Sequence, residues 1–107
     1  MRIEARLLAI ERAGKILLWK RGADSRRLHG FWELPSAEDL PKARELQAVG
    51  SFRHSITNHN YIFTVVRAAL ARAGSRFQWL EVSRLNGLPL STTTRKALAL
   101  LDGSRTT

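Results

Sequence analysis

Apolar and polar residues alternate over several short stretches of this chain, and such alternation is typical of β-strands with one buried face. Two of these stretches flank a short Gly-containing turn at 13–15, which predicts a β-hairpin near the start of the chain. Another, at 31–35, is a short strand that ends at Pro35. The last, at 77–85, begins as a strand and ends in a helical turn. The stretches lie at 3–12, 16–21, 31–35, 51–57, 61–71 and 77–85.

Turn-forming residues separate these stretches. Asn58, His59 and Asn60 join 51–57 to 61–71, and asparagine tolerates the left-handed backbone that a tight turn requires. The remaining connections are expected to be loops or turns at 22–30, 72–76 and 86–90.

The pattern changes to a helical one in two places. Residues 36–50 predict a short helix, in which Ser36 or Asp39 caps the start, Pro41 fits the first turn and Gly50 follows the end.

The second helix is amphipathic and is expected at 91–101, with Ser91 or a nearby threonine as its cap and Leu90 as a hydrophobic staple. Gly103 lies beyond its end, and 102–107 form a frayed tail. The order β-β-β-α-β-β-β-α predicts a single domain over 1–107, of the α/β (α+β) class, with a mixed β-sheet flanked by two helices.

The charge indicates a polyanionic partner. The chain has 107 residues, 44% of them apolar and 25% charged, which is enough for a modest core. Its 18 Lys+Arg against 9 Asp+Glu give a net charge of +9. Most of the cations are arginines, which suit bidentate contacts with phosphates or bases. The simpler alternative is a basic surface without a specific partner.

The absence of cysteine excludes disulfides, a thiolate nucleophile, iron–sulfur clusters and Cys-ligated zinc within this chain. Three scattered histidines do not favour a metal site. No stretch approaches the roughly 20 apolar residues of a transmembrane helix, and the charged start does not resemble a signal peptide. The sequence therefore predicts an intracellular, cytoplasmic and nucleoid-associated chain that does not bind a membrane.

The segment "GFWELPS" and the later "RELQAVG" resemble the Nudix fold, whose enzymes place a glutamate-rich box on one helix. Arg44, Glu45 and Leu46 match part of that box, but the paired glutamates that should follow are absent. Pyrophosphate cleavage needs several carboxylates around Mg²⁺ or Mn²⁺, and one carboxylate does not organise such an ion. The resemblance therefore implies a Nudix-like fold with neither a catalytic nor a metal site. The simplest interpretation of Glu45 is a solvated helix residue.

Three segments in order resemble the C-terminal domain of adenine DNA glycosylases of the MutY type. They are the strand "GFWELP" at 30–35, the segment "FRHSITN" at 52–58, which matches the family's "F-x-H-x-F-S-H", and "LP" at 88–89 followed by "TRKAL" at 94–98. Enzymes of that family remove adenine mispaired with 8-oxoguanine. Their iron–sulfur cluster and glycosylase chemistry lie in a separate N-terminal domain, so no cofactor is expected in this chain.

By this resemblance, the loop of the hairpin reads the lesion. Ile56 would wedge into the base stack, Thr57 would offer the hydroxyl that accepts from the N7–H of 8-oxoguanine, and Asn58 would be the polar third residue. The chain departs from the family at Ile56 and Asn58, and His59 stands one place beyond the family's histidine. An ordinary hairpin turn explains Thr57, Asn58 and His59 equally well.

Other polar residues have weaker signals. Strand alternation places Phe52, His54 and Ile56 on one face, which makes His54 an orienting or packed residue rather than a catalyst. Ser55 beside a histidine lacks a carboxylate that would orient a base. The remaining cations near these segments, Arg26, Arg27 and Arg53, are candidate phosphate contacts or simply solvated charges.

The function expected from the sequence is lesion recognition for an adenine glycosylase in base-excision repair, without catalysis by this chain itself. The expected partners are duplex DNA containing 8-oxoguanine and a glycosylase catalytic domain, in the same chain or in another. Two alternatives stay open: a divergent Nudix hydrolase of nucleoside diphosphate-linked substrates, and a protein-interaction module that uses a sheet edge.

Overall fold

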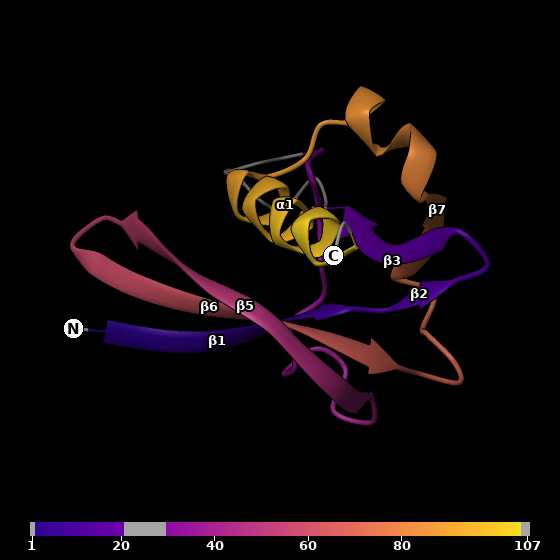
Figure 1. The fold of residues 1–107 in the computed structure, drawn as a ribbon, viewed down its shortest axis with the longest axis horizontal. Helices are drawn as coiled ribbons and strands as arrows, with labels where there is room; N and C mark the ends of the chain where they lie inside the picture. Colours follow the sequence, from indigo (N-terminus) through magenta and orange to yellow (C-terminus); the bar gives the residue numbers. More distant parts are fainter. Residues whose placement is uncertain (1, 21–29, 106–107) are drawn as a thin grey trace.

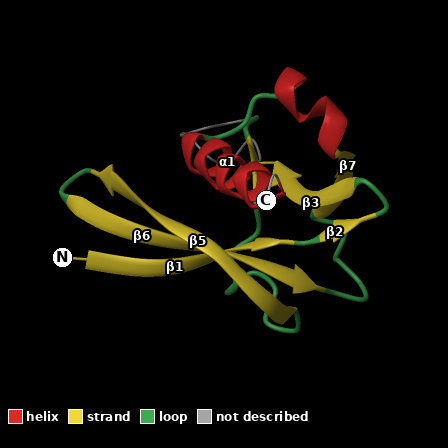
Figure 2. Ribbon diagram, viewed as in Figure 1, coloured by secondary structure: helices red, strands yellow, loops and turns green. Residues whose placement is uncertain are grey.

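The computed structural model describes residues 2–20 and 30–105. Strands dominate it, with one α-helix and one 3-10 helix (Figure 2). In chain order the elements are β1 (Arg2–Ala9), β2 (Glu11–Arg12), β3 (Lys15–Lys20), β4 (Trp32–Glu33), β5 (Arg44–Ile56), β6 (His59–Ala69), β7 (Phe77–Glu81), the 3-10 helix η1 (Val82–Gly87) and α1 (Thr92–Arg105).

The strands form two sheets. The first has the order β1-β6-β5, with β1 parallel and β5 antiparallel to β6, so it is mixed as predicted. In the second, β3 pairs antiparallel with β2, β4 and β7. The helix α1 lies over one face of the first sheet, and β3 and β7 lie beside it (Figure 1).

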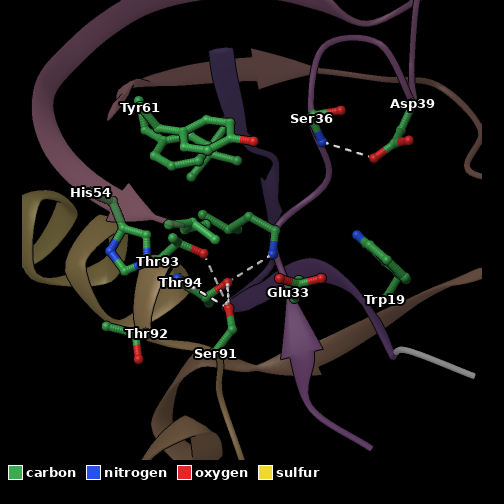
Figure 3. Close-up of a pocket in the computed structure, with 14 residues that line it drawn as sticks. Trp19, Glu33, Ser36, Asp39, His54, Tyr61, Ser91, Thr92, Thr93 and Thr94 are labelled. Atoms are coloured by element: carbon green, nitrogen blue, oxygen red, sulfur yellow. Dashed lines mark hydrogen bonds between the residues drawn. The ribbon is translucent and has the colours of Figure 1, made fainter. Parts of the chain in front are cut away.

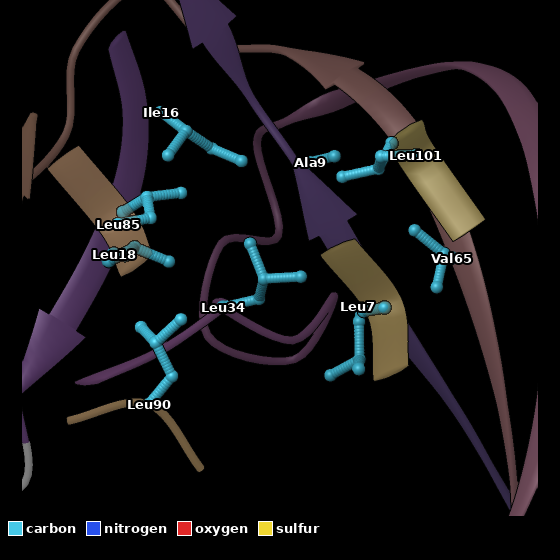
Figure 4. Packing of buried hydrophobic residues seen from close by; sticks show 10 residues of the cluster. Leu7, Ala9, Ile16, Leu18, Leu34, Val65, Leu85, Leu90 and Leu101 are labelled. Carbon is cyan, nitrogen blue, oxygen red and sulfur yellow. The ribbon is translucent and has the colours of Figure 1, made fainter. Parts of the chain in front are cut away.

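The main core lies where α1 meets both sheets (Figure 4). Leu101 and Ala97 of α1 are fully buried there, as expected for the apolar stripe of an amphipathic helix. Burial of these side chains is the main force that fixes α1 against the strands. The buried members are Leu7, Ala9, Ile16, Leu18, Leu34, Val65, Leu85, Leu90, Ala97 and Leu101.

The predicted pairing of 3–12 with 16–21 is only partly right. The hairpin is limited to β2 and β3, joined at Ala13 and Gly14, which both have positive φ. Residues 2–9 form a separate strand that pairs parallel with β6 in the other sheet. All four residues from Leu7 to Ile10 are buried, and such a continuous apolar run needs cover on both faces, which a two-stranded hairpin does not provide.

The predicted helix at 36–50 is wrong. Residues 36–43 form turns, and the remainder belongs to β5, so Glu45 is a strand residue. The backbone here is engaged elsewhere: Pro35 O accepts from Leu8 N–H at 2.8 Å, and Ala37 N–H donates to Arg6 O at 3.0 Å. Pairing with β6, through two bulges, then replaces the helix over 44–50.

The predicted C-terminal helix is confirmed, but it is longer than expected. Ser91 Oγ accepts from Thr94 N–H at 3.3 Å, as an N-cap does, and Leu90 is buried. The helix continues through Gly103 to Arg105 rather than ending at Leu101. Residues 106–107 and the expected loop at 22–29 lie outside the described residues.

Candidate nucleic-acid interface

A two-residue turn, Thr57–Asn58, joins β5 to β6 at one end of the first sheet. Both residues have positive φ, 38° and 62°, as the type I′ turns favoured in two-residue hairpins require. The turn lies at the same end of the molecule as the start of β1 (Figure 1). The predicted tight turn is thus confirmed one residue earlier than expected, with His59 already in β6.

Thr57 is an unusual residue for this conformation. Asparagine tolerates a left-handed backbone, whereas a β-branched residue at positive φ is a genuine outlier. Holding one residue in such a conformation costs on the order of 1–3 kcal/mol, and strained residues of this kind cluster at functional sites. Thr57 is therefore poorly explained as a turn former alone.

The tip brings most of the predicted site residues together. Ile56 pairs directly with His59 across the turn and is half-buried, whereas Thr57, Asn58 and His59 are exposed. Arg53 is exposed and lies in β5 before the tip. Arg26 and Arg27 lie outside the described residues.

Behind the tip, the hairpin is fastened to α1 through Lys96. Its Nζ lies 3.2 Å from His54 Nδ1 and 3.5 Å from Arg53 O, and 5.8 Å from the centre of the Phe52 ring. Partial burial lowers the pKa of His54 from 6.5, and the Lys96 ammonium lowers it further. In its neutral form the imidazole accepts a hydrogen bond from Lys96, which ties the ring to α1.

Aromatic rings stiffen the same part of the hairpin. Phe52 and Phe63 stack across the two strands at 5.4 Å, and Phe63 stacks on Tyr61 at 5.5 Å along β6. These contacts support the distal half of the hairpin where it leaves the core.

A cavity of about 630 Å³ opens beside the hairpin, between it and the start of α1 (Figure 3). A hydroxyl network closes its floor: Ser91 Oγ donates to Thr94 Oγ1 at 2.9 Å, and Thr94 Oγ1 accepts from Leu34 N–H at 3.2 Å. The lining combines apolar and aromatic side chains with polar ones, and is made by Leu7, Trp19, Glu33, Leu34, Ser36, Asp39, His54, Ile56, Tyr61, Phe63 and residues 91–94.

Sequence reasoning missed both Lys96 and the cavity. The "RK" pair at 95–96 was a local signal for Lys96, but its contact with β5 depends on how α1 crosses the sheet. The cavity is lined by residues from five separate segments of the chain, so no local sequence pattern predicts it.

The partial match to the Nudix box does not form a helix face. Arg44, Glu45 and Leu46 lie in β5, where successive side chains point to opposite faces. Glu45 instead accepts two hydrogen bonds from Arg6 Nη1, at 2.9 and 3.2 Å. Over 2–20 and 30–105, no group of three or more His, Asp or Glu side chains is placed to hold a metal ion.

None of the helices in the described part of the chain is both long and apolar enough to cross a membrane.

Comparison with known proteins identifies the fold. No family model matches the chain, and no curated protein matches it.

Among solved structures, the C-terminal domain of mouse MUTYH, in a complex with human PCNA, is 21% identical with a TM-score of 0.73, over 97% of this chain and 90% of that one. The MutT protein of Methanosarcina mazei Go1 is 16% identical with a TM-score of 0.77, over 99% and 96% of the two chains. A MutT Nudix hydrolase from Burkholderia pseudomallei is 20% identical with a TM-score of 0.72, over 94% and 98%. These likenesses confirm the predicted fold class: the chain has a Nudix-like α+β fold.

Proposed function

We propose that this chain is the lesion-recognition domain of an adenine DNA glycosylase and binds duplex DNA at 8-oxoguanine during base-excision repair. The observation that carries the proposal is the position of Thr57, a β-branched residue at φ 38° on an exposed hairpin tip. A turn selected only for folding would favour asparagine or glycine there. The segment that contains Thr57 is also the one that resembles the lesion-reading loop of the MutY-type family.

The chemistry at the tip suits this role. The lesion differs from guanine by a carbonyl at C8 and by an N7–H donor, and the Thr57 hydroxyl is an acceptor for that donor. Ile56 supplies an apolar side chain beside it, of the kind that wedges between base steps. Asn58 and His59 add exposed polar groups next to Thr57. Arg53, Arg26 and Arg27 are the proposed phosphate contacts.

In this proposal the adenine is removed elsewhere. The glycosylase half is a separate domain, in the same chain or in a partner, and it carries the iron–sulfur cluster. The likeness to the mouse MUTYH C-terminal domain supports this arrangement at the level of the fold. An open reading frame that continues upstream into a Cys-containing glycosylase half would support this arrangement, whereas adjacent independent genes would keep the alternatives open.

Replacing the Thr57 hydroxyl tests the proposal. Thr57→Val keeps the β-branched shape and its backbone strain but deletes one hydrogen bond, worth roughly 0.5–1.5 kcal/mol. In a fusion to a glycosylase half, the preference for excision opposite 8-oxoguanine over guanine should fall roughly twofold to tenfold. Thr92→Val, an exposed threonine on α1, is the matched control and should keep the preference. Equal preference in the wild-type and Thr57→Val fusions would mean that Thr57 is only a turn residue.

A second candidate function is the binding of a free nucleotide. The observation that favours it is the cavity of about 630 Å³, which is large enough for a purine nucleoside. Phe63 and Tyr61 offer ring surfaces to a base, and His54 and Asp39 offer polar groups to its edge. Nucleotide binding is therefore proposed for the cavity if the tip does not read DNA. Calorimetric titration with purine nucleoside phosphates tests for it.

A further inference from the structure

The first sheet has a second face, turned away from α1, and the part of it toward the tip is mostly polar, while Leu8, Val66 and Ala68 are buried at its other end. Side chains alternate across the sheet, so Phe52 and Phe63 pack toward α1 while their neighbours point to the opposite side. On that opposite side, the strand register arranges nine residues of β5, β6 and β1 in three cross-strand rows. From the tip inward the rows are Ser55–Asn60–Arg2, Arg53–Ile62–Glu4 and Ser51–Thr64–Arg6. We call this set the open face.

Only Ile62 among the nine is apolar, and it and Thr64 are half-buried while the other seven are exposed. Cross-strand hydrogen bonds order the hydroxyls: Ser51 Oγ lies 3.0 Å from Thr64 Oγ1, and Ser55 Oγ donates to Asn60 Oδ1 at 3.0 Å. The open face is therefore a mainly polar array in which two cross-strand hydrogen bonds hold the hydroxyl and amide groups in place.

The charges on the open face are not all engaged. The charge of Arg6 is paired with that of Glu45, because Arg6 Nη1 donates to both oxygens of the Glu45 carboxylate. Arg2 and Arg53 belong to the two rows nearest the tip, and neither guanidinium has a hydrogen-bond or ion-pair partner among the described residues. Cations are thus available next to the turn Thr57–Asn58, with Glu4 as the one opposing charge of these two rows.

We propose that the open face binds the sugar–phosphate backbone of the duplex whose base the tip reads. The inference rests on the proposed function for the placement of the tip, and it names the surface along which the DNA lies. Guanidinium, hydroxyl and amide groups are the side chains that contact phosphates most often. The open face is also continuous with the tip, because Ser55 and Asn60 directly flank its closing pair, Ile56 and His59.

A protein partner fits the open face less well than DNA does. The centre of a protein–protein interface is usually apolar and depleted of charge, with aromatic residues and methionine enriched. The open face has one aliphatic side chain, four charged ones and four that carry hydroxyl or amide groups. Its make-up is that of a surface that contacts phosphate directly or through water.

Cysteine protection locates the DNA directly, because the chain contains no cysteine and each variant has a single thiol. Ser51→Cys and Ser55→Cys place that thiol on the open face, and Ser83→Cys places it on η1 as an exposed control. Saturating undamaged duplex at low salt should slow alkylation of the first two variants severalfold and leave the third unchanged. Protection of Ser83→Cys alone, or of none of the three while duplex is bound, would overturn the proposal.

The salt dependence of duplex binding tests the two cations. Each phosphate contact contributes a slope of about 0.9, so Arg2→Ala with Arg53→Ala should flatten the slope by about 1.8. Lysine at both positions keeps the charge and should restore the slope. Arg84→Ala, on η1 and with its guanidinium only 3.1 Å from Glu81, removes one cation outside the open face and should leave the slope unchanged. An unchanged slope in the double alanine variant would remove Arg2 and Arg53 from the footprint and contradict the proposal.

These results are separable from those of the Thr57 experiment. Equal lesion preference in the wild-type and Thr57→Val fusions, with protection of the open face, would leave this inference standing and overturn the proposed reading by the tip. A lower preference in Thr57→Val, with protection at η1 instead of the open face, would do the reverse. Complete absence of duplex binding at low salt would overturn both.

Discussion

His54 lies where the β5–β6 hairpin meets α1, and its protonation state decides whether its contact with Lys96 is attractive. The neutral ring accepts from Lys96 at 3.2 Å, whereas an imidazolium would face a second cation at the same distance. Arg53 is its chain neighbour and Tyr61 its cross-strand partner, and the acidic groups of the same cavity are Glu33 and Asp39. Acid should therefore loosen the hairpin from the helix.

We expect Lys96→Met to raise the pKa of His54 toward 6.5, without reaching it, because burial is the larger cause of the lowering and is retained. In the wild type, the unfolding free energy should fall as the pH drops from above 6.5 through the lowered pKa, because the unfolded state takes up the proton first. This fall should be smaller in Lys96→Met. Proton NMR titration of the signal that His54→Gln removes measures the pKa, and urea titrations at several pH values measure the stability.

Arg95→Met is the control for that prediction. It removes a neighbouring exposed cation from α1 that makes no contact with the hairpin among the described residues. It should leave the His54 titration as in the wild type. The same His54 pKa in Lys96→Met and in the wild type would show that Lys96 does not act on the imidazole.

Single residues at the tip were predictable only in part. The tolerance of Asn58 for a left-handed backbone is local and can be seen in the sequence. The use of Thr57 as the other turn residue cannot, because a β-branched residue argues against positive φ. The turn position is set instead by the β5–β6 register, with Phe52 opposite Phe63 and Ile56 opposite His59. That register depends on burial of one face against α1.

At the scale of elements, the missing helix at 36–50 shows how tertiary pairing overrides local signals. The signals themselves are real: Ser36 N–H donates to Asp39 Oδ2 at 3.1 Å, as in the start of a helix or a turn. The chain nevertheless forms turns instead of a helix, because residues 44–50 pair with β6 and because the backbone groups of Pro35 and Ala37 hydrogen-bond to β1. Helix propensity is a fraction of a kcal/mol per residue, which sheet formation readily exceeds. By contrast, α1 was predictable because its cap and its apolar stripe are both local.

The β2–β3 turn provides a test of backbone conformation without steric interference. Gly14 has φ +79°, and a Cβ there would meet nothing within 4 Å. Gly14→Ala should therefore lower the unfolding free energy by about 1 kcal/mol, entirely from the left-handed backbone. Thermal or urea unfolding measures the change.

Gly74→Ala is the matched control for Gly14→Ala. Its Cβ would also meet nothing within 4 Å, but its φ lies outside the left-handed region. Alanine there should be neutral or stabilise by up to about 1 kcal/mol, because it restricts the unfolded chain. Equal effects of the two substitutions would mean that the Ala13–Gly14 turn does not have the left-handed geometry described.

At the scale of the whole molecule, the Nudix-like fold is present while the geometry of its catalytic box is not. Three short segments were enough to indicate the fold, because they fall on β4, the β5–β6 hairpin and the region of α1. The site around them was not predictable as a whole. The cavity and the open face both depend on the pairing of β1 with β6, between residues that are far apart in the sequence.

We expect no Mg²⁺- or Mn²⁺-dependent hydrolysis of nucleoside triphosphates or dinucleotide pyrophosphates, even if a nucleotide binds in the cavity. Such hydrolysis needs several carboxylates around the metal, and Glu45 lies in a strand with both oxygens engaged by Arg6. Phosphate release over a broad substrate panel, measured beside calorimetric binding of the same nucleotides, separates binding from turnover.

Glu38→Gln, which removes an exposed carboxylate from the 36–43 turns, is the control for Glu45→Gln. Metal-dependent turnover that survives in Glu38→Gln and disappears in Glu45→Gln would establish a hydrolase and contradict the binding-domain proposal.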